Sequence, residues 1–322
     1  MKKTLFIIYF FFAGLVSAFC QQEKQLLPSE VKQLTVVQEP VTLNKGFFRF
    51  GLITSFFSQE KSFDNAGKKY INLFNSTARS WEYKLGVSYG ISNRLQANVE
   101  IPYENSKFYI SSNNIIPFQD SIFKDVYLQK EKGIGDIRLS FNYQILTETD
   151  NRPSVTFDGF VSLPTGKKEF SNVKSEFEYD YPTGAGTTML TSSLYVRKII
   201  FPYAVYFQAI FDYPFKGKKL IEPYDATKKS FKNYNDYFLK GGGYFMLNDW
   251  ISLGDELSYT YDWGKWTEGV PNLYDHASQF NDQVTLSFQI KRIRFSQIIL
   301  FTLYGVNSAA DPIYYARLQY TL

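Results

Sequence analysis

Apolar and polar side chains alternate along the chain from about residue 47 onward. In the segment 134–146, one face of an extended strand would carry Ile137, Leu139, Phe141, Tyr143 and Ile145. The residues between them are polar. Because successive side chains of a β-strand point to opposite faces, a period of two residues predicts strands with one apolar and one polar face. No helical period competes with this pattern after the first 20 residues.

The same alternation recurs in twelve segments. We expect strands at 47–57, 80–91, 95–109, 134–146, 154–163, 187–197, 203–213, 236–247, 251–263, 281–291, 294–304 and 312–322. Short turns such as 92–94 alternate with long polar loops such as 110–133, which is typical of outer-membrane barrels. The pattern therefore predicts an all-β fold, a transmembrane antiparallel up-and-down β-barrel of about 12 strands over residues 47–322. Asp255 departs from it on an apolar face, where we expect a β-bulge or a position above the apolar band.

The first 20 residues have the features of a secretory signal peptide. Lys2 and Lys3 precede an apolar run over residues 5–16, which is too short to span a bilayer as a helix. Small side chains at Ala18 and Cys20 favour cleavage after Cys20, and lipid modification of Cys20 is the alternative. Residues 21–46 are polar without a strong period. We expect them to form a periplasmic lead, which is also a candidate plug for the lumen.

The composition of the chain limits the kinds of functional site that it can hold. Aromatic side chains make up 19% of the chain, and such side chains suit a surface that faces lipid and its interfaces. Loss of residues 1–20 would remove Lys2, Lys3 and the single cysteine, leaving 33 basic and 31 acidic side chains. This near balance leaves no large excess of basic side chains, such as nucleic-acid-binding proteins have. Without the cysteine, the chain could form no disulfide and would have no thiol nucleophile. The sequence shows no metal-ligand cluster or phosphate-binding glycine loop, so we expect no metal and no cofactor.

Charged side chains on the polar strand faces should point into the barrel. They carry both signs, so most of them can pair within a narrow lumen while a few line a route for a solute. The candidate lumen-lining residues are Arg49, Glu82, Lys84, Glu100, Asp136, Arg138, Asp158, Asp212, Lys240, Glu256, Lys291 and Arg317.

Three short glycine motifs lie near the middle of the chain. A strand-start motif, Gly-Ile-Gly-Asp, contains Gly133, Gly135 and Asp136; Leu-Pro-Thr-Gly at 163–166 ends the next predicted strand, and Gly-Ala-Gly at 184–186 opens the following one. In this order the motifs resemble the outer-membrane family named for the meta-pathway of phenol degradation, over most of residues 47–322. The resemblance implies an exported barrel that transports small solutes, often apolar or aromatic.

We therefore expect a channel or transporter for small solutes in the bacterial outer membrane, rather than an enzyme. One alternative is an outer-membrane lipid hydrolase, because the spacing of His276 and Ser278 puts both on one strand face and Asn281 follows. The Asn-Gly pair that follows the serine in such hydrolases is missing here. The other alternative is a structural or adhesive barrel without transport.

Two features predict partners. The loop 214–235 carries Lys216, Lys218 and further cations that suit the phosphates of lipopolysaccharide. The last predicted strand, 312–322, alternates up to the apolar Leu322, as do the final strands that the barrel-insertion machinery recognises. The expected partners are outer-membrane lipid, lipopolysaccharide, the insertion machinery and a small solute.

Overall fold

The computed structural model describes residues 42–71, 77–110, 127–175, 178–220, 227–232, 235–248, 250–264, 266–267, 270–271 and 276–322. The expected signal peptide at 1–20 and most of the expected lead, 21–41, lie outside these residues. No helix in the described part of the chain is long and apolar enough to cross a membrane.

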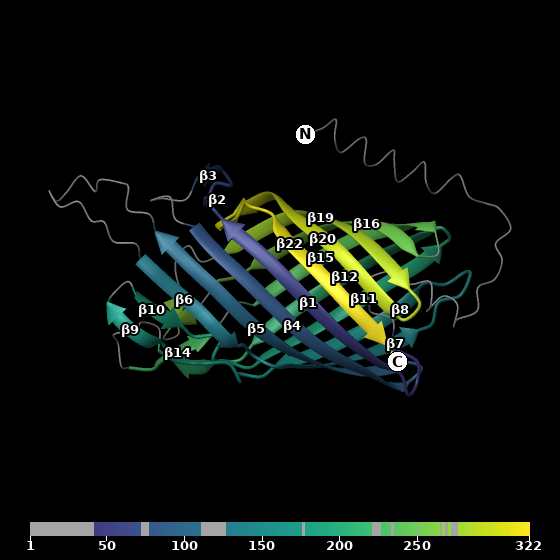
Figure 1. Ribbon diagram of the computed structural model, residues 1–322, viewed down its shortest axis with the longest axis horizontal. Coiled ribbons are helices and arrows are strands. Elements are labelled where there is room, and N and C mark those ends of the chain that lie inside the picture. Colours follow the sequence, from purple (N-terminus) through teal and green to yellow (C-terminus); the bar gives the residue numbers. More distant parts are fainter. Residues whose placement is uncertain are drawn as a thin grey trace. The chain divides into compact units, whose positions relative to one another are not determined.

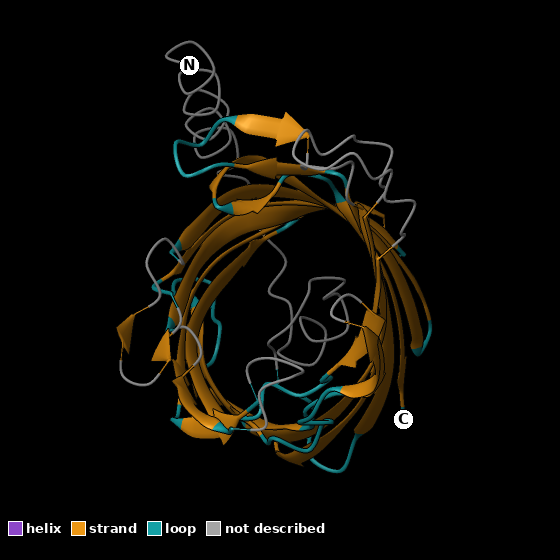
Figure 2. Cartoon of the chain, turned by 90° about the vertical axis from the view of Figure 1, so that its left-hand side faces the viewer, coloured by secondary structure: helices purple, strands orange, loops and turns teal. Residues whose placement is uncertain are grey.

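Twelve strands close into an antiparallel β-barrel (Figures 1 and 2). They are β1(Phe48–Gln59), β4(Thr77–Ser92), β5(Leu95–Ile110), β7(Arg138–Leu146), β8(Ser154–Ser162), β11(Met189–Ile200), β12(Tyr203–Pro214), β15(Asp236–Asn248), β16(Ile251–Asp262), β19(Ala277–Ile290), β20(Ile293–Val306) and β22(Ile313–Thr321). Each pairs with the next along the chain, and β22 pairs with β1, so the ring has no free edge. The predicted fold and the predicted strand count are confirmed.

The two faces of each barrel strand differ in polarity. On the outer face of β4, Trp81 and Leu85 are 44% and 59% exposed. The side chains between them belong to the inner face, where Lys84 and Ser88 line an internal cavity. An outer surface with so many exposed apolar side chains is stable only against lipid, so the alternation that the sequence shows places hydrocarbon outside and polar groups inside.

Hydrogen bonds run across the polar inner wall from strand to strand. The Asn98 side chain of β5 donates to Asn142 of β7 at 2.6 Å, and Asn142 donates to the carboxylate of Asp158 on β8. Ser193 of β11 donates to the same carboxylate at 2.8 Å. These bonds satisfy a carboxylate that is buried in the wall, as buried polar groups require.

The seam between the first and last strands is closed by backbone hydrogen bonds. The Phe48 N–H donates to the Leu322 carbonyl at 3.2 Å, and the Leu322 N–H donates to Phe48 at 2.8 Å. Just before the seam, Thr42 and Leu43 are buried, and the Leu43 N–H donates to the inward-facing Gln96 side chain at 2.7 Å. The described end of the lead therefore packs at the inner side of the turn between β4 and β5, and the rest of the expected plug falls outside the described residues.

Ten short strands extend the long loops, where the sequence predicts no strands. They are β2(Lys61–Phe63), β3(Lys69–Ile71), β6(Tyr127–Ile134), β9(Ser171–Ser175), β10(Glu178–Tyr181), β13(Gly217–Lys219), β14(Lys229–Lys232), β17(Trp266–Thr267), β18(Val270–Pro271) and β21(Ser308–Ala309). β6 continues the pairing of β5 beyond β7, and β10 lies parallel to β6. Of the other eight, seven pair into two small sheets, and β9 pairs with β10 in antiparallel orientation.

Two local predictions are wrong, and one of two alternatives for a third position is excluded. The strand expected at 134–146 is interrupted at 135–137, between β6 and β7. Lys291, expected on the inner wall, is exposed in the turn after β19 and has a φ of 54°, because β19 ends one residue earlier. Of the two alternatives expected for Asp255, the bulge does not form, since this residue pairs in continuous register with Gly243 and Val284 and is exposed on the outer face. Its position above the apolar band stays a prediction.

Candidate functional site in the lumen

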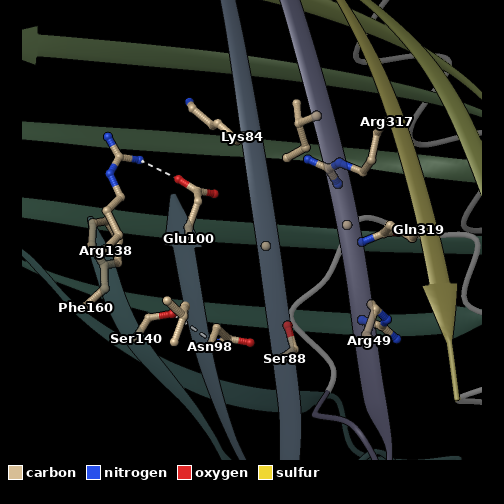
Figure 3. A pocket seen from close by; sticks show the side chains of 14 residues that line it. Arg49, Lys84, Ser88, Asn98, Glu100, Arg138, Ser140, Phe160, Arg317 and Gln319 are labelled. Carbon is tan, nitrogen blue, oxygen red and sulfur yellow. Dashed lines mark hydrogen bonds and ion pairs between the residues drawn. The ribbon is translucent and has the colours of Figure 1, made fainter. Parts of the chain in front are cut away.

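A cavity of about 290 Å³ lies against the inner wall, lined by residues of β1, β4, β5, β7, β8 and β22 (Figure 3). Five of the predicted lumen residues meet there: Arg49, Lys84, Glu100, Arg138 and Arg317. Figure 3 shows Arg49 and Arg317 on one side of the cavity and the Arg138–Glu100 pair on the other. Strands from both ends of the sequence thus contribute to one site, because the closure of the ring makes them neighbours.

Two of these cations have carboxylate partners within salt-bridge distance. Arg138 Nη1 lies 3.5 Å from Glu100 Oε1, and Lys84 Nζ lies 3.0 Å from Glu82 Oε2. The side chains of both pairs are partly exposed to the lumen. Arg138 also lies over the ring of Phe160, at 6.0 Å from its centroid. Charged and aromatic groups therefore line the same cavity.

The remaining predicted charges on the inner wall lie in separate buried contacts. Lys240 Nζ is 3.6 Å from Glu256 Oε2, and the Tyr206 hydroxyl donates to the same carboxylate. Asp212 accepts a hydrogen bond from Thr191. With Asp158, these carboxylates are occupied by neighbours in the wall, which is the structural role that a narrow lumen favours.

Sequence reasoning missed a stack of three tyrosines on the inner wall. Tyr195, Tyr206 and Tyr244 come from the adjacent strands β11, β12 and β15, and all three are buried. Their ring centroids are 5.5 Å and 5.7 Å apart, with nearly parallel planes. The parity of each strand puts its tyrosine inside, but only the cross-strand register shows that the three rings meet.

The three glycine motifs converge on one carboxylate. Asp136 Oδ1 accepts the N–H of Gly166 at 2.9 Å, and Oδ2 accepts the N–H of Ala185 at 2.8 Å. A Cβ added to Gly166 would lie 2.7 Å from the Cα of Gly184, so this close approach of two backbones requires glycine. Asp136, predicted to line the lumen, therefore holds two loop segments against the strand break at 135–137.

The two glycines of the strand-start motif shape that break. Gly133 has a φ of 148°, which favours glycine. Gly135 is buried, and its N–H donates to the Pro102 carbonyl at 3.0 Å. The resemblance to the barrel family thus rests on residues that build one local structure.

The hydrolase residues are not assembled. His276 is exposed one residue before β19, and Ser278 is the second residue of that strand. Asn281 is buried and lies an odd number of residues from Ser278, so its side chain belongs to the opposite face of β19. Among the described residues, no cluster of three or more His, Cys, Asp or Glu side chains is placed to hold a metal ion.

The lysines of the loop 214–235 are partly engaged. Lys228 lies 2.9 Å from Glu169 of another loop, with both side chains more than half exposed. Lys232 lies over the ring of Tyr213 at 4.6 Å. Binding of lipopolysaccharide by this loop stays a prediction.

No family model matches the sequence. Among solved structures, the chain is similar to the COG4313 outer membrane channel from Pseudomonas putida F1, with a TM-score of 0.67 and 14% identity over 89% of this chain and 100% of that one. The NanC porin covers 85% of this chain and 100% of its own, with 11% identity and a TM-score of 0.45. The translocator domain of the autotransporter NalP from Neisseria meningitidis gives 8% identity, 92% of each chain and a TM-score of 0.45. The first likeness shows that the two chains share one β-barrel fold.

Proposed function

We propose that this protein is a channel or transporter of the bacterial outer membrane and carries small solutes through its lumen. The observation that carries the proposal is a closed ring with an apolar outer face, a polar inner wall and a cavity of about 290 Å³ on that wall. The barrel fold supports the expected location in the outer membrane.

The resemblance of the glycine motifs implies apolar or aromatic solutes. Support from the structure comes from Phe160, whose ring lines the cavity, while charged and amide residues make up half of the lining. We therefore propose solutes that combine a small apolar or aromatic body with a polar group, because both kinds of lining are then matched.

Swelling of liposomes in arabinose tests transport directly. We expect the reconstituted protein to raise the swelling rate above that of protein-free liposomes. Gly86→Trp should slow swelling, because Gly86 lines the cavity and a Cβ there would have no heavy atom closer than 3.9 Å, so a large side chain can enter the open space. Leu85→Trp is the matched control, since Leu85 is on the outer face.

Swelling at the protein-free rate by a correctly folded barrel would overturn the proposal and leave a structural or adhesive barrel. Equal swelling by the wild type and Gly86→Trp would show that solutes do not pass this cavity. Folding is checked by the shift in gel mobility that barrels show on heating.

A further inference from the structure

The lining of the cavity is strongly positive. It contains one carboxylate, Glu100, and four cations, Arg49, Lys84, Arg138 and Arg317. Glu100 lies by Arg138, and Glu82, just outside the lining, lies by Lys84. Even when both acids are counted, the cations around the cavity exceed the carboxylates by two. A low-dielectric wall strengthens the resulting field, which attracts anions.

One donor nitrogen of Arg317 has no hydrogen-bond partner among the described residues. Arg317 lies on β22 beside Ile53 of β1, and the nitrogen is its buried Nε. Arg49 Nε donates to the Thr321 hydroxyl at 3.2 Å. The guanidinium group of Arg49 is repelled by those of Arg294 and Arg317, with Arg294 acting more strongly. An anion between two such groups would relieve the repulsion and accept charge-assisted hydrogen bonds.

The shape of the cavity adds an apolar side. Gly51 and Gly86 pair across β1 and β4 and present bare backbone to the cavity. A Cβ on either would have no heavy atom closer than 3.9 Å, so the space over them is open. Ile53 and Phe160 also line the cavity. A volume of about 290 Å³ lies near the lower end of small-molecule sites, about 300–1,000 Å³.

We propose that this cavity binds small organic carboxylates. Three observations support this: the excess of positive charge, the Arg317 Nε without a hydrogen-bond partner among the described residues, and the open space over Gly51 and Gly86, which we call the glycine floor. The carboxylate accepts hydrogen bonds from Arg317 and Arg49, whose planar guanidinium groups match it. The apolar body of the solute lies over Gly51 and Gly86, towards Phe160. This inference rests on the proposed transport function and names its solute class.

Equilibrium binding tests the inference without requiring transport. The full-length protein in lipid nanodiscs is titrated with 4-fluorobenzoate, and with 4-fluorobenzyl alcohol as the neutral counterpart, while ¹⁹F NMR reports the bound fraction above empty nanodiscs. We expect the benzoate to bind about tenfold or more tightly than the alcohol. Arg317→Gln should raise the Kd of the benzoate about tenfold, because one charge-assisted interaction is lost.

Two further variants distinguish the loss of this binding site from a general change in the charge of the protein. Arg94→Gln removes the same charge from the exposed turn between β4 and β5 and should leave the Kd unchanged. Gly86→Val keeps every charge but fills part of the floor, so it should weaken binding of the benzoate. All variants are first checked for the heat-dependent gel shift of a folded barrel.

The inference is overturned if the two probes bind equally, or if folded Arg317→Gln binds the benzoate as the wild type does. If either result is found while the wild-type protein still causes liposome swelling, only the binding inference is rejected and the proposed channel function is retained. Tight benzoate binding without swelling would instead support the site and reject transport.

Discussion

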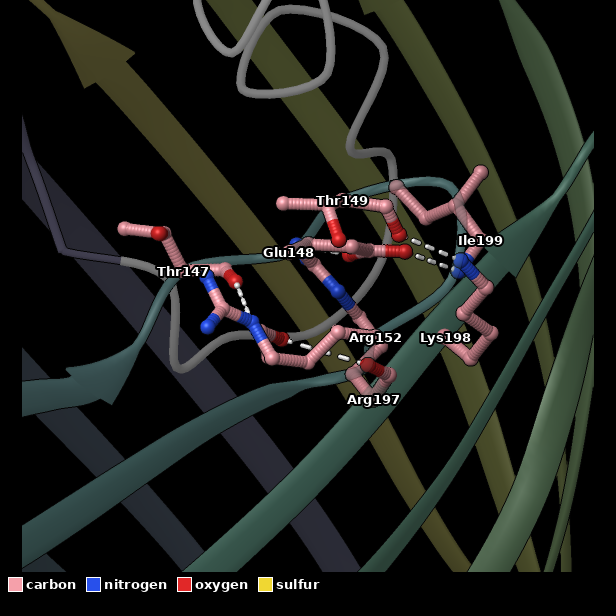
Figure 4. A network of polar contacts seen from close by, with 8 residues as sticks. Thr147, Glu148, Thr149, Arg152, Arg197, Lys198 and Ile199 are labelled. Atoms are coloured by element: carbon pink, nitrogen blue, oxygen red, sulfur yellow. Dashed lines mark hydrogen bonds and ion pairs between the residues drawn. The ribbon is translucent and has the colours of Figure 1, made fainter.

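The guanidinium group of Arg197 lies 3.3 Å from the carboxylate of Glu148, and the two side chains are only 2% and 9% exposed (Figure 4). Glu148 also accepts the N–H of Ile199, and Lys198 donates to the Thr149 carbonyl at 2.6 Å. These contacts fasten the turn 147–153 to the end of β11. Breaking a buried ion pair leaves an uncompensated charge, so the turn should depend on this pair.

Glu148→Ala is predicted to lower the free energy of unfolding by about 3–5 kcal/mol. Glu169→Ala is the matched control, because its pair with Lys228 is 55% and 59% exposed and should contribute at most about 1 kcal/mol. Urea unfolding of the protein in lipid vesicles, followed by tryptophan fluorescence, measures both. Similar losses in the two variants would contradict a special role for the buried pair.

The two backbone hydrogen bonds that Asp136 accepts give a second prediction. Asp136→Ala leaves the amides of Gly166 and Ala185 without their acceptor, at about 1–3 kcal/mol for each group that stays buried. We expect lower stability and faster proteolysis in the loop 163–186. Asp136→Asn, which keeps one carbonyl acceptor, should fall between the alanine variant and the wild type.

Asp64→Ala is the control for Asp136→Ala. Asp64 also accepts two backbone N–H groups, from Ala66 and Lys68, but in an exposed loop where water can replace it. Its loss should cost much less than that of Asp136. If the two alanine variants lose equal stability and equal protease resistance, the convergence of the glycine motifs has no structural importance.

Asp255 lies on the outer, lipid-facing side of β16 near the apolar Leu253, and Asp282 of β19 is a nearby carboxylate. A carboxylate facing lipid is unfavourable, so Asp255→Leu should stabilise the barrel in vesicles by about 1–2 kcal/mol. The reverse change nearby, Leu253→Asp, should destabilise it. Urea unfolding in the same vesicles checks both variants. A loss of stability in Asp255→Leu would show that the carboxylate is needed on this face, for example by a partner.

The faces of the barrel strands could be predicted from the sequence because alternation is a local property. The apolar residues of 138–146 must meet lipid, so the polar ones between them must face inward. The same reasoning puts Arg49 and Arg317 inside. It could not show that they share one cavity, because β1 and β22 become neighbours only when the ring closes.

Other features depend on details that a local pattern does not contain. Lys291 differs from its expected place by a single residue at a strand end. β6 ends at the strand break at 135–137, where backbone segments some 30 to 50 residues apart meet at Asp136. The stack of Tyr195, Tyr206 and Tyr244 depends on register, which the sequence alone does not set.

The barrel and its polar lumen depend on the side that each residue of a barrel strand faces, and spin labels on β7 measure this most directly. The single native cysteine, Cys20, falls in the expected signal peptide, so single cysteines can be introduced at positions 138–145 without a competing thiol. Labels at Leu139, Phe141 and Tyr143 should be more accessible to oxygen, which concentrates in lipid. Labels at Ser140 and Asn142 should be more accessible to a water-soluble nickel complex. Accessibility without a two-residue period, or a period of opposite phase, would contradict the barrel described here.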